Sequence, residues 1–353
     1  MRPWARVSAC IVGMLAGAAG TVMLAEPVVW VASAASGALA TIAGLEIGRR
    51  VPPTTASATV PRPDELLPTA STPRRPIAPP TDPSERRWAV HRRRLAAELE
   101  TAVGSGALRL AFQPVVALRS CEVVAFEAAF HWQRADGHVA LPDELTAIAH
   151  ETGLIVPMGR WLIEEACRQL ARWNDSVPDR APLTVAVPVS TRLVMTPDLG
   201  RHVGDVVERR GIDPECLLLQ ITETAFTEHG STFAQLEAVR RIGVRVAIDG
   251  YGTGAATLTH LASLPIDALK IDRGFVADLG VLTNDTTVIS AFVTLGHALG
   301  LDVIAEGVDT DAQLAMLQTL GCDLAQGNYF ARPMSATRAA GIVRDRTMHM
   351  PGV

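Results

Sequence analysis

Six polar side chains stand at or near the ends of separate apolar runs, where they could combine into one site. They comprise three carboxylates, two carboxamides and one lysine: Glu127, Asp249, Glu306, Gln220, Gln326 and Lys270. In α/β barrels the carboxyl ends of the strands meet at one mouth, so such side chains would form a ring. Oxygen ligands around a single cation are typical of a metal-assisted site that acts on a phosphate ester. Unrelated polar residues in loops are the alternative, but their repeated position, one to a strand, argues against it.

Lys270 is the only lysine among the 32 Lys and Arg residues of the chain. A compact ammonium can contact a phosphate or a nucleophilic water in a tight pocket, where a planar guanidinium would not fit. The alternative is that this lysine has no function and occurs by chance in a chain that otherwise uses arginine. A lysine without a function would, however, more often lie on the surface than beside Ile271 at a strand end. We therefore expect the Lys270 ammonium at the mouth, near solvent, where Lys270→Ala would affect ligand binding more than folding.

The elements that must position these residues alternate between strand and helix across residues 88–346. Apolar runs end at residues 118, 130, 189, 221, 248, 271, 304 and 324, and helical patterns cover residues 157–173, 285–299 and 311–320. Eight strands in this rhythm predict an α/β fold of the (β/α)8 TIM-like barrel type. The first two runs, 108–118 and 121–132, are joined too tightly for a helix, so we expect one antiparallel strand.

The same region resembles the EAL domain family, which hydrolyses the bacterial messenger cyclic di-GMP to a linear dinucleotide. The resemblance covers residues 108–335 and rests on ordered motifs: Phe-Gln-Pro-Val-Val at 112–116, Phe-Glu-Ala-Ala-Phe-His-Trp at 126–132, Glu-Thr-Gly-Leu-Ile at 151–155, Leu-Gln-Ile-Thr-Glu at 219–223, Asp-Gly-Tyr-Gly-Thr-Gly at 249–254, Leu-Pro-Ile-Asp-Ala-Leu-Lys-Ile-Asp at 264–272, Ala-Glu-Gly-Val-Asp at 305–309 and Ala-Gln-Gly at 325–327.

The resemblance implies Mg²⁺ or Mn²⁺ as cofactor and gives roles to three groups of residues. The metal ligands would be Glu127, Asp249 and Gln220, the catalytic residues Lys270 and Glu306, and the nucleotide-binding residues Gln113, His131, Gln326 and Arg332.

Four positions depart from the family pattern. Pro188 replaces a ligating Asn, Gln220 a Glu, Gly250 the second of two Asp, and His131 a phosphate-binding Arg. Hard divalent cations need oxygen ligands, preferably anionic ones. We therefore expect an incomplete metal site, in which Lys270 and Glu306 are vestigial.

Three functions remain open at this point. The first is a catalytically impaired receptor or interaction module in cyclic di-GMP signalling. The second is a weakly active, metal-dependent cyclic di-GMP phosphodiesterase, so that the chain is not assigned as an enzyme or a non-enzyme. The third is a nucleotide-independent scaffold, which the resemblance implies would dimerise through the Gly-Thr-Gly loop and the following helix. The partner would be a second copy of the chain or another protein. A net charge of −5 argues against a nucleic acid polymer as partner.

The first 50 residues are predicted to form a transmembrane hairpin. Residues 7–25 and 28–45 are two apolar runs long enough to cross a bilayer as helices, with arginines before the first and after the second. The positive-inside rule then anchors the chain in the inner, cytoplasmic membrane through residues 7–45 and places the barrel in the cytoplasm. A cleaved signal peptide is the alternative.

Residues 51–87 form a linker rich in Pro and Arg, and residues 347–353 form a short tail. The linker arginines would lie on anionic lipid or begin a solvated helix, and the sequence does not separate the two. Five scattered cysteines form neither a disulfide framework nor a zinc motif, which fits a reducing compartment.

Overall fold

The computed structural model describes residues 92–102, 107–134, 142–228, 230–252, 261–279 and 283–347. All of them belong to one compact unit, Pro80–Val353. The predicted hairpin, the whole predicted linker, most of the Gly-Thr-Gly loop and residues 348–353 of the predicted tail lie outside the described residues. No helix within the described part of the chain is long and apolar enough to cross a membrane.

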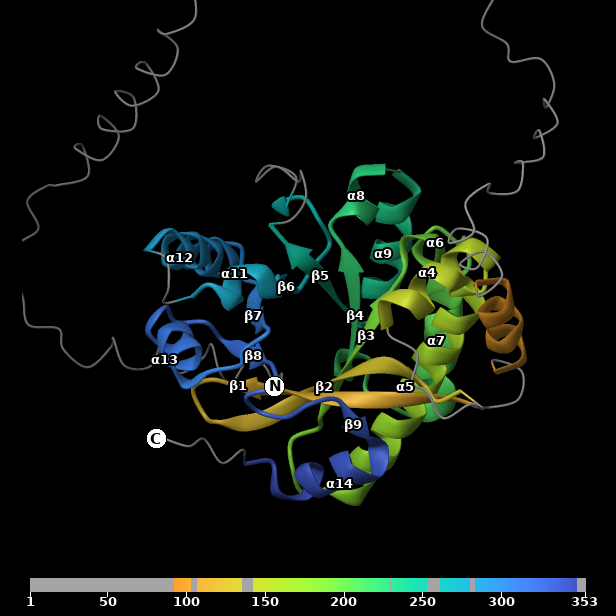
Figure 1. Cartoon of the computed structure of the whole chain (residues 1–353), viewed down its shortest axis with the longest axis horizontal. Helices are drawn as coiled ribbons and strands as arrows, with labels where there is room; N and C mark the ends of the chain where they lie inside the picture. Colours follow the sequence, from red (N-terminus) through yellow and green to blue (C-terminus); the bar gives the residue numbers. More distant parts are fainter. Residues whose placement is uncertain are drawn as a thin grey trace, which may run out of the picture. The chain divides into compact units, whose positions relative to one another are not determined.

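Eight strands close a barrel, which confirms the eight strands predicted from the sequence (Figure 1). They are β1 (Leu108–Ala117), β2 (Glu122–Trp132), β3 (Thr184–Val189), β4 (Leu217–Thr222), β5 (Arg245–Tyr251), β6 (Ala268–Ile271), β7 (Asp302–Glu306) and β8 (Leu324–Gln326). Strands β2 to β8 pair in parallel in chain order. Strand β1 closes the ring by pairing antiparallel with both β2 and β8, so the predicted antiparallel strand is confirmed.

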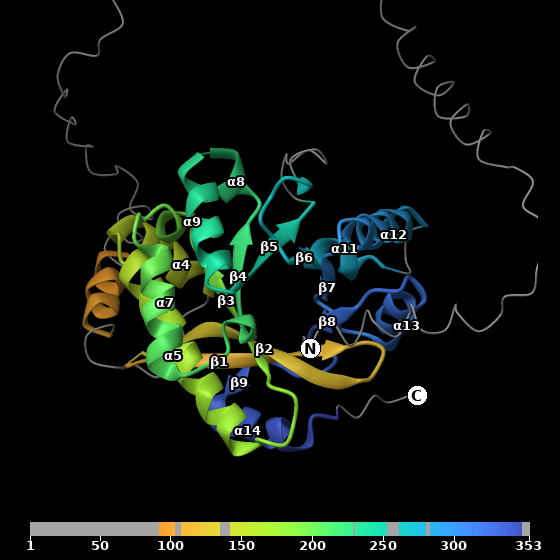
Figure 2. The same ribbon diagram turned by 180° about the vertical axis from the view of Figure 1, so that it is seen from behind.

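Helices surround this barrel and match the predicted helical patterns. They are α4 (Pro142–Thr152), α5 (Ile155–Ser176), α6 (Thr191–Val194), α7 (Leu199–Arg210), α8 (Thr224–Glu228), α9 (Gly230–Arg241), α11 (Arg273–Ala277), α12 (Thr283–Ala298), α13 (Asp311–Thr319) and α14 (Ala336–Asp345). Both views place α5, α7 and α9 on one flank of the barrel and α12 and α13 on the other (Figures 1 and 2).

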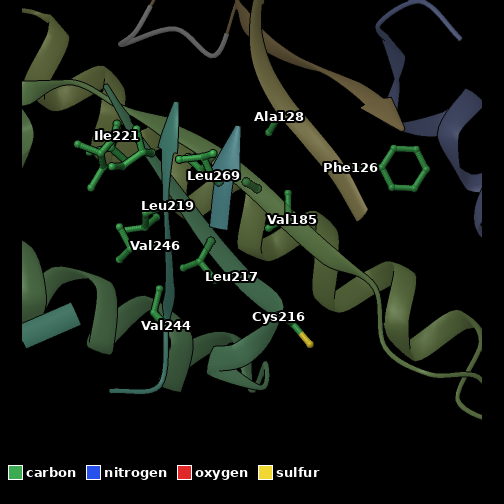
Figure 3. Close-up of a cluster of buried hydrophobic side chains, with 14 of the residues drawn as sticks. Phe126, Ala128, Val185, Cys216, Leu217, Leu219, Ile221, Val244, Val246 and Leu269 are labelled. Atoms are coloured by element: carbon green, nitrogen blue, oxygen red, sulfur yellow. The ribbon is translucent and has the colours of Figure 1, made fainter. Parts of the chain in front are cut away.

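A large apolar core lies between the strands and the helices. Figure 3 shows fully buried side chains from successive strands, among them Phe126 of β2, Val185 of β3 and Leu219 of β4. The ring of Phe126 packs against Trp173 of α5, with centroids 4.9 Å apart. Because side chains alternate along a strand, Glu127 points to the opposite face, into the barrel.

A smaller apolar cluster backs the far end of the β1–β2 hairpin. Leu95 and Leu99, from the helical residues 92–102, pack with Leu108 of β1 and Trp132 of β2. Phe130 of β2 stacks on Trp161 of α5, with centroids 6.3 Å apart. The hairpin is therefore held rigidly from outside where it rises above the other strands.

The last described residues run along β1 from the mouth side to the end where the parallel strands begin. A ninth strand, β9 (Met334–Ser335), which the sequence patterns did not predict, pairs with β1 and leads into α14. The amide of Val123 then donates to the carbonyl oxygen of Arg346 at 2.8 Å. Figure 1 shows α14 on the side of the molecule away from α8.

Aspartates near the beginnings of three strands each have a donor. Asp267, before β6, accepts from Arg240 at 2.9 Å and from the Val246 amide at 3.0 Å. Asp302 of β7 pairs with Arg245 at 2.5 Å. Asp323, before β8, lies 3.0 Å from His297 and accepts from the Val303 amide. We call these three carboxylates and their donors the basal cluster.

Candidate functional site

Lys270 lies one residue before the end of β6, and its side chain is only 2% exposed. Its ammonium nitrogen Nζ lies 2.7 Å from Glu127 Oε2, 3.1 Å from Glu306 Oε2 and 3.3 Å from Asp249 Oδ1. The carboxylates come from β2, β7 and β5, so the barrel brings together residues that the sequence placed in one ring. Three negative charges share one positive charge. We call these four residues the mouth cluster.

The expectation that the Lys270 ammonium lies near solvent is wrong. The ammonium is enclosed because the neighbouring strands turn their carboxylates inward over it. Those carboxylates are 18–32% exposed, so water reaches the cluster from the carboxylate side. Lys270 is consequently part of the folding energetics of the barrel, since removing one member of a buried ion pair leaves its partners uncompensated.

The ionisation of the mouth cluster follows from burial and from these contacts. Burial disfavours the charged form of Lys270, but the carboxylates Glu127, Asp249 and Glu306 raise its pKa, so it stays protonated. Burial also opposes ionisation of Glu127, but Lys270 and the neighbouring amides lower the pKa of that carboxyl. Burial raises the pKa of Glu306 even though Lys270 acts against it. Glu127 is therefore the firmly ionised partner of Lys270.

Three glutamines extend the mouth cluster around the ring. Gln220 Nε2 donates to Glu127 Oε2 at 3.2 Å. Gln326 Nε2 donates to Gln113 Oε1 at 2.9 Å, and Gln113 Nε2 donates to the carbonyl oxygen of Ala331 at 3.0 Å. The buried Oε1 atoms of Gln220 and Gln326 have no hydrogen-bond partner within the described residues. Two amide oxygens thus remain for a bound water or a ligand.

Asp249 reaches Lys270 through an irregularity in β5. The pairing between β5 and β6 shifts register between Ile248 and Tyr251, which is where Asp249 and Gly250 lie. Gly250 has φ of +69°, in the left-handed region that glycine adopts without steric cost. Such bulges re-aim a side chain next to a site. Gly250 accommodates this turn but supplies no ligand.

Pro188 lies in β3, opposite Gln220 of β4. The pairing between β2 and β3 ends at Glu127 and Ala186, two residues before Pro188. The missing N–H of Pro188 therefore interrupts no described pairing with β2. Its ring occupies a mouth position without offering a donor or an acceptor.

The remaining predicted residues, His131 and Arg332, do not join this hydrogen-bonded network within the described residues. His131 lies four residues beyond Glu127 on the same face of β2. Arg332 is exposed. It follows Ala331, whose carbonyl oxygen accepts a hydrogen bond from Gln113. Arg109, directly opposite His131 in the β1–β2 register, was missed from the sequence. Applying the pairing of the predicted hairpin to its inward face would have found it.

Among the residues that the structure describes, no group of three or more His, Cys, Asp or Glu side chains is arranged to hold a metal ion. The three carboxylates of the mouth cluster converge on an ammonium. The arrangement can therefore hold an ionised carboxylate beside a buried cation, next to amide donors and acceptors.

Comparison with known proteins matches residues 96–333 to the EAL domain. The uncharacterized protein y4lL of Sinorhizobium fredii is 34% identical over 257 residues, which cover 72% of this chain and 30% of that protein. The bifunctional diguanylate cyclase/cyclic di-GMP phosphodiesterase MucR of Pseudomonas aeruginosa is 36% identical over 240 residues, which cover 68% of this chain and 35% of that protein. The chain spans about a third of the length of these curated relatives.

Solved structures agree with this match. The PaMucR phosphodiesterase in complex with c-di-GMP gives a TM-score of 0.67 at 35% identity and covers 70% of this chain and 99% of that one. The FimX EAL domain from Pseudomonas aeruginosa bound to c-di-GMP gives a TM-score of 0.61 at 25% identity. The match covers 67% of this chain and 95% of that one. Since the family match spans more than half of the chain and its barrel is complete, the chain belongs to the EAL domain family.

Proposed function

We propose that this chain is a receptor for cyclic di-GMP whose capacity for hydrolysis is impaired. EAL domains are generally Mg²⁺- or Mn²⁺-dependent phosphodiesterases, and related EAL structures contain c-di-GMP. The observation that carries the proposal is the mouth cluster, in which the Lys270 ammonium takes up all three carboxylates. Binding and hydrolysis are separable properties of one fold.

The donor set does not fit two divalent ions. Such a site must offset about four positive charges with oxygen ligands. Pro188 and Gly250 offer no side-chain oxygen, and Gln220 directs its amide nitrogen towards Glu127. A bound metal would supply Lewis-acid activation of water and phosphate. Without it, Lys270 and Glu306 are vestigial as catalytic residues and serve as polar contacts.

The polar residues around the mouth cluster suit binding of a phosphodiester. Lys270 stays protonated because its carboxylate partners raise its pKa, so the cluster keeps one positive charge among its three carboxylates. Gln113 holds both Gln326 and the carbonyl oxygen of Ala331, and so fixes the segment that carries Arg332. We assign Gln113 to positioning, and Gln326, His131 and Arg332 to direct contact with the nucleotide.

A weakly active phosphodiesterase is the second candidate. The observation that favours it is the partial exposure of Glu127, Asp249 and Glu306, which leaves their oxygens reachable from the mouth. One ion could bind there only if Lys270 withdrew from the carboxylates. The scaffold hypothesis stays a prediction.

The chain is further proposed to be tethered to the cytoplasmic membrane, with the barrel in the cytoplasm. The proposal assigns residues 1–50 to a transmembrane hairpin, 51–87 to a linker, 88–346 to the barrel and 347–353 to a tail. Two apolar runs with arginines outside both support it. A reporter fused after residue 346 should be cytoplasmic, and the protein should resist carbonate extraction. A secreted product lacking about the first 25 residues would contradict the tether.

Calorimetry of the full-length chain in detergent with cyclic di-GMP, with and without Mn²⁺, tests the receptor. We expect binding without metal and little linear dinucleotide in a parallel assay. Brisk turnover by the wild type would support the enzyme instead, and no binding in either condition would exclude the receptor.

A repair experiment tests whether missing ligands cause the impairment. The fourfold variant Pro188→Asn, Gln220→Glu, Gly250→Asp and His131→Arg restores two anionic ligands, one amide oxygen and a bidentate phosphate contact. Single changes should leave the rate of hydrolysis nearly unchanged, because the residues would serve one cluster. The left-handed backbone of Gly250 makes Asp a tolerated but costly replacement there. A folded but inert fourfold variant would show that the defect lies elsewhere.

A further inference from the structure

The β1–β2 hairpin continues past the mouth cluster. Gln113 of β1 lies opposite Glu127 of β2. On the same face of the hairpin, four residues away along each strand, Arg109 lies opposite His131. At about 3.4 Å per residue, the two pairs are about 14 Å apart along the strands. Glu127 is also the last residue of β2 that pairs with β3, so the second pair stands on a wall above the ring.

Only two methyl groups stand between these pairs on the inner face. Ala111 and Ala129 occupy the intervening positions and lie opposite each other. Nothing larger on this face of the hairpin separates Arg109 from the mouth cluster. The outer face is filled by Leu108, Phe130 and Trp132, which pack against α5 and the helical residues 92–102. The wall is therefore preorganised and Arg109 is directed to the inner side.

The two levels differ in charge. The mouth cluster carries three carboxylates around one ammonium, so it cannot attract a dianion unaided. Arg109 is exposed, and no ion pair or hydrogen bond of its side chain is seen within the described residues. A guanidinium binds a phosphate oxygen pair in bidentate fashion, whereas the neighbouring His131 offers a single donor.

We infer that Arg109 binds a phosphodiester of the nucleotide, with His131 beside it. The inference rests on the proposed function and deepens it by naming a residue that recognises a phosphate of the ligand. Arg109 supplies from β1 the bidentate positive charge that position 131 of β2 lacks.

The test compares Arg109→Ala, Arg109→Lys and the control Arg119→Ala in the full-length chain. Arg119 is exposed in the turn at the other end of the same hairpin, so its loss changes the net charge equally. Cyclic di-GMP affinity is measured by calorimetry at two salt concentrations. We expect Arg109→Ala to weaken binding roughly tenfold to a hundredfold, as for loss of a charged hydrogen bond. Arg109→Lys should recover part of the loss, and Arg119→Ala should bind as the wild type does.

A second ligand tests the assigned partner atom. With an analogue in which both phosphodiesters are replaced by uncharged linkages, Arg109→Ala should reduce affinity much less than it does with cyclic di-GMP. If the wild type and Arg109→Ala bind cyclic di-GMP equally well, the inference about Arg109 is wrong, but the proposal of a receptor still holds. A wild type that does not bind would overturn both. Because Arg109 and Arg119 are exposed, all variants should have the melting temperature of the wild type, which thermal denaturation measures.

Discussion

The two ends of the barrel both concentrate carboxylates, but they balance them differently. In the basal cluster each aspartate has its own arginine, histidine or backbone amide. In the mouth cluster three carboxylates share Lys270, and two neighbouring amide oxygens lack donors within the described residues. The basal carboxylates thus each have their own donor, whereas the mouth carboxylates share a single cation. This division matches the general separation of stability and function in such barrels.

The largest effect should come from removing the shared cation. Lys270→Ala leaves three facing carboxylates and should lower the free energy of unfolding by about 3–5 kcal/mol at neutral pH, as for breaking a buried ion pair. The ammonium and a divalent ion compete for the same oxygens, so Mn²⁺ should raise the melting temperature of this variant more than that of the wild type. Equal responses to Mn²⁺ would show that the ammonium does not block the metal position.

The matching change at the base should affect stability alone. Arg245 is 13% exposed and pairs with Asp302, which is 25% exposed. Arg245→Met should lower the free energy of unfolding by about 2–3 kcal/mol, somewhat less than a fully buried pair because water reaches both groups. Chemical denaturation measures this loss. Cyclic di-GMP affinity should stay unchanged, and a large loss of affinity would contradict the division between the two ends.

Increasing the charge imbalance at the mouth gives a smaller effect with a clear sign. Gln220→Glu replaces an amide that donates to Glu127 by a fourth carboxylate. We expect a loss of about 1–2 kcal/mol at neutral pH, since like charges in one site disfavour each other. The same change should increase Mn²⁺ affinity, whereas Gln318→Glu, distant from the mouth cluster, should not. If stability and Mn²⁺ affinity both stay unchanged, the hydrogen bond from Gln220 to Glu127 contributes to neither.

The smallest effect is a pH dependence. The folded pKa of Glu127 lies below its ordinary value of 4.5, so its stabilising contribution is present above pH 4.5 and disappears as the pH falls through the folded pKa. The difference in unfolding free energy between wild type and Glu127→Gln should therefore shrink below pH 4.5. Chemical denaturation at a series of pH values from about 3 to about 7 measures this difference. A difference that does not change with pH would show that the ionised form of Glu127 does not stabilise the fold.

The fold was predictable because its signals are local. Each apolar run of a strand ends near a polar residue, and the short connection at residues 118–121 forces the first two strands into a hairpin. The composition of the mouth was likewise predictable from residues near strand ends. Glu127 itself lies in the middle of β2, where the neighbouring strand β3 stops pairing.

What the sequence could not supply depends on distances between strands. The burial of Lys270 follows from carboxylates that three other strands turn towards it, and no local pattern encodes that convergence. The two-residue strand β9 is too short for a periodic signal. Arg109 carries no motif of its own, and its place opposite His131 emerges only from the register of the hairpin.

The bonds made by Gln113 also constrain the order in which the molecule is assembled. Its partners Gln326 and Ala331 lie 213 and 218 positions further along the chain. Contacts of such sequence separation form late, because the entropy of closing a long loop must be overcome first. Until β8 has emerged from the ribosome, β1 and β7 present open edges that invite pairing with other chains. A nascent or clipped chain that ends before Leu324 therefore has an exposed sheet and lacks Gln326, so the proposed nucleotide site can form only in the completed polypeptide.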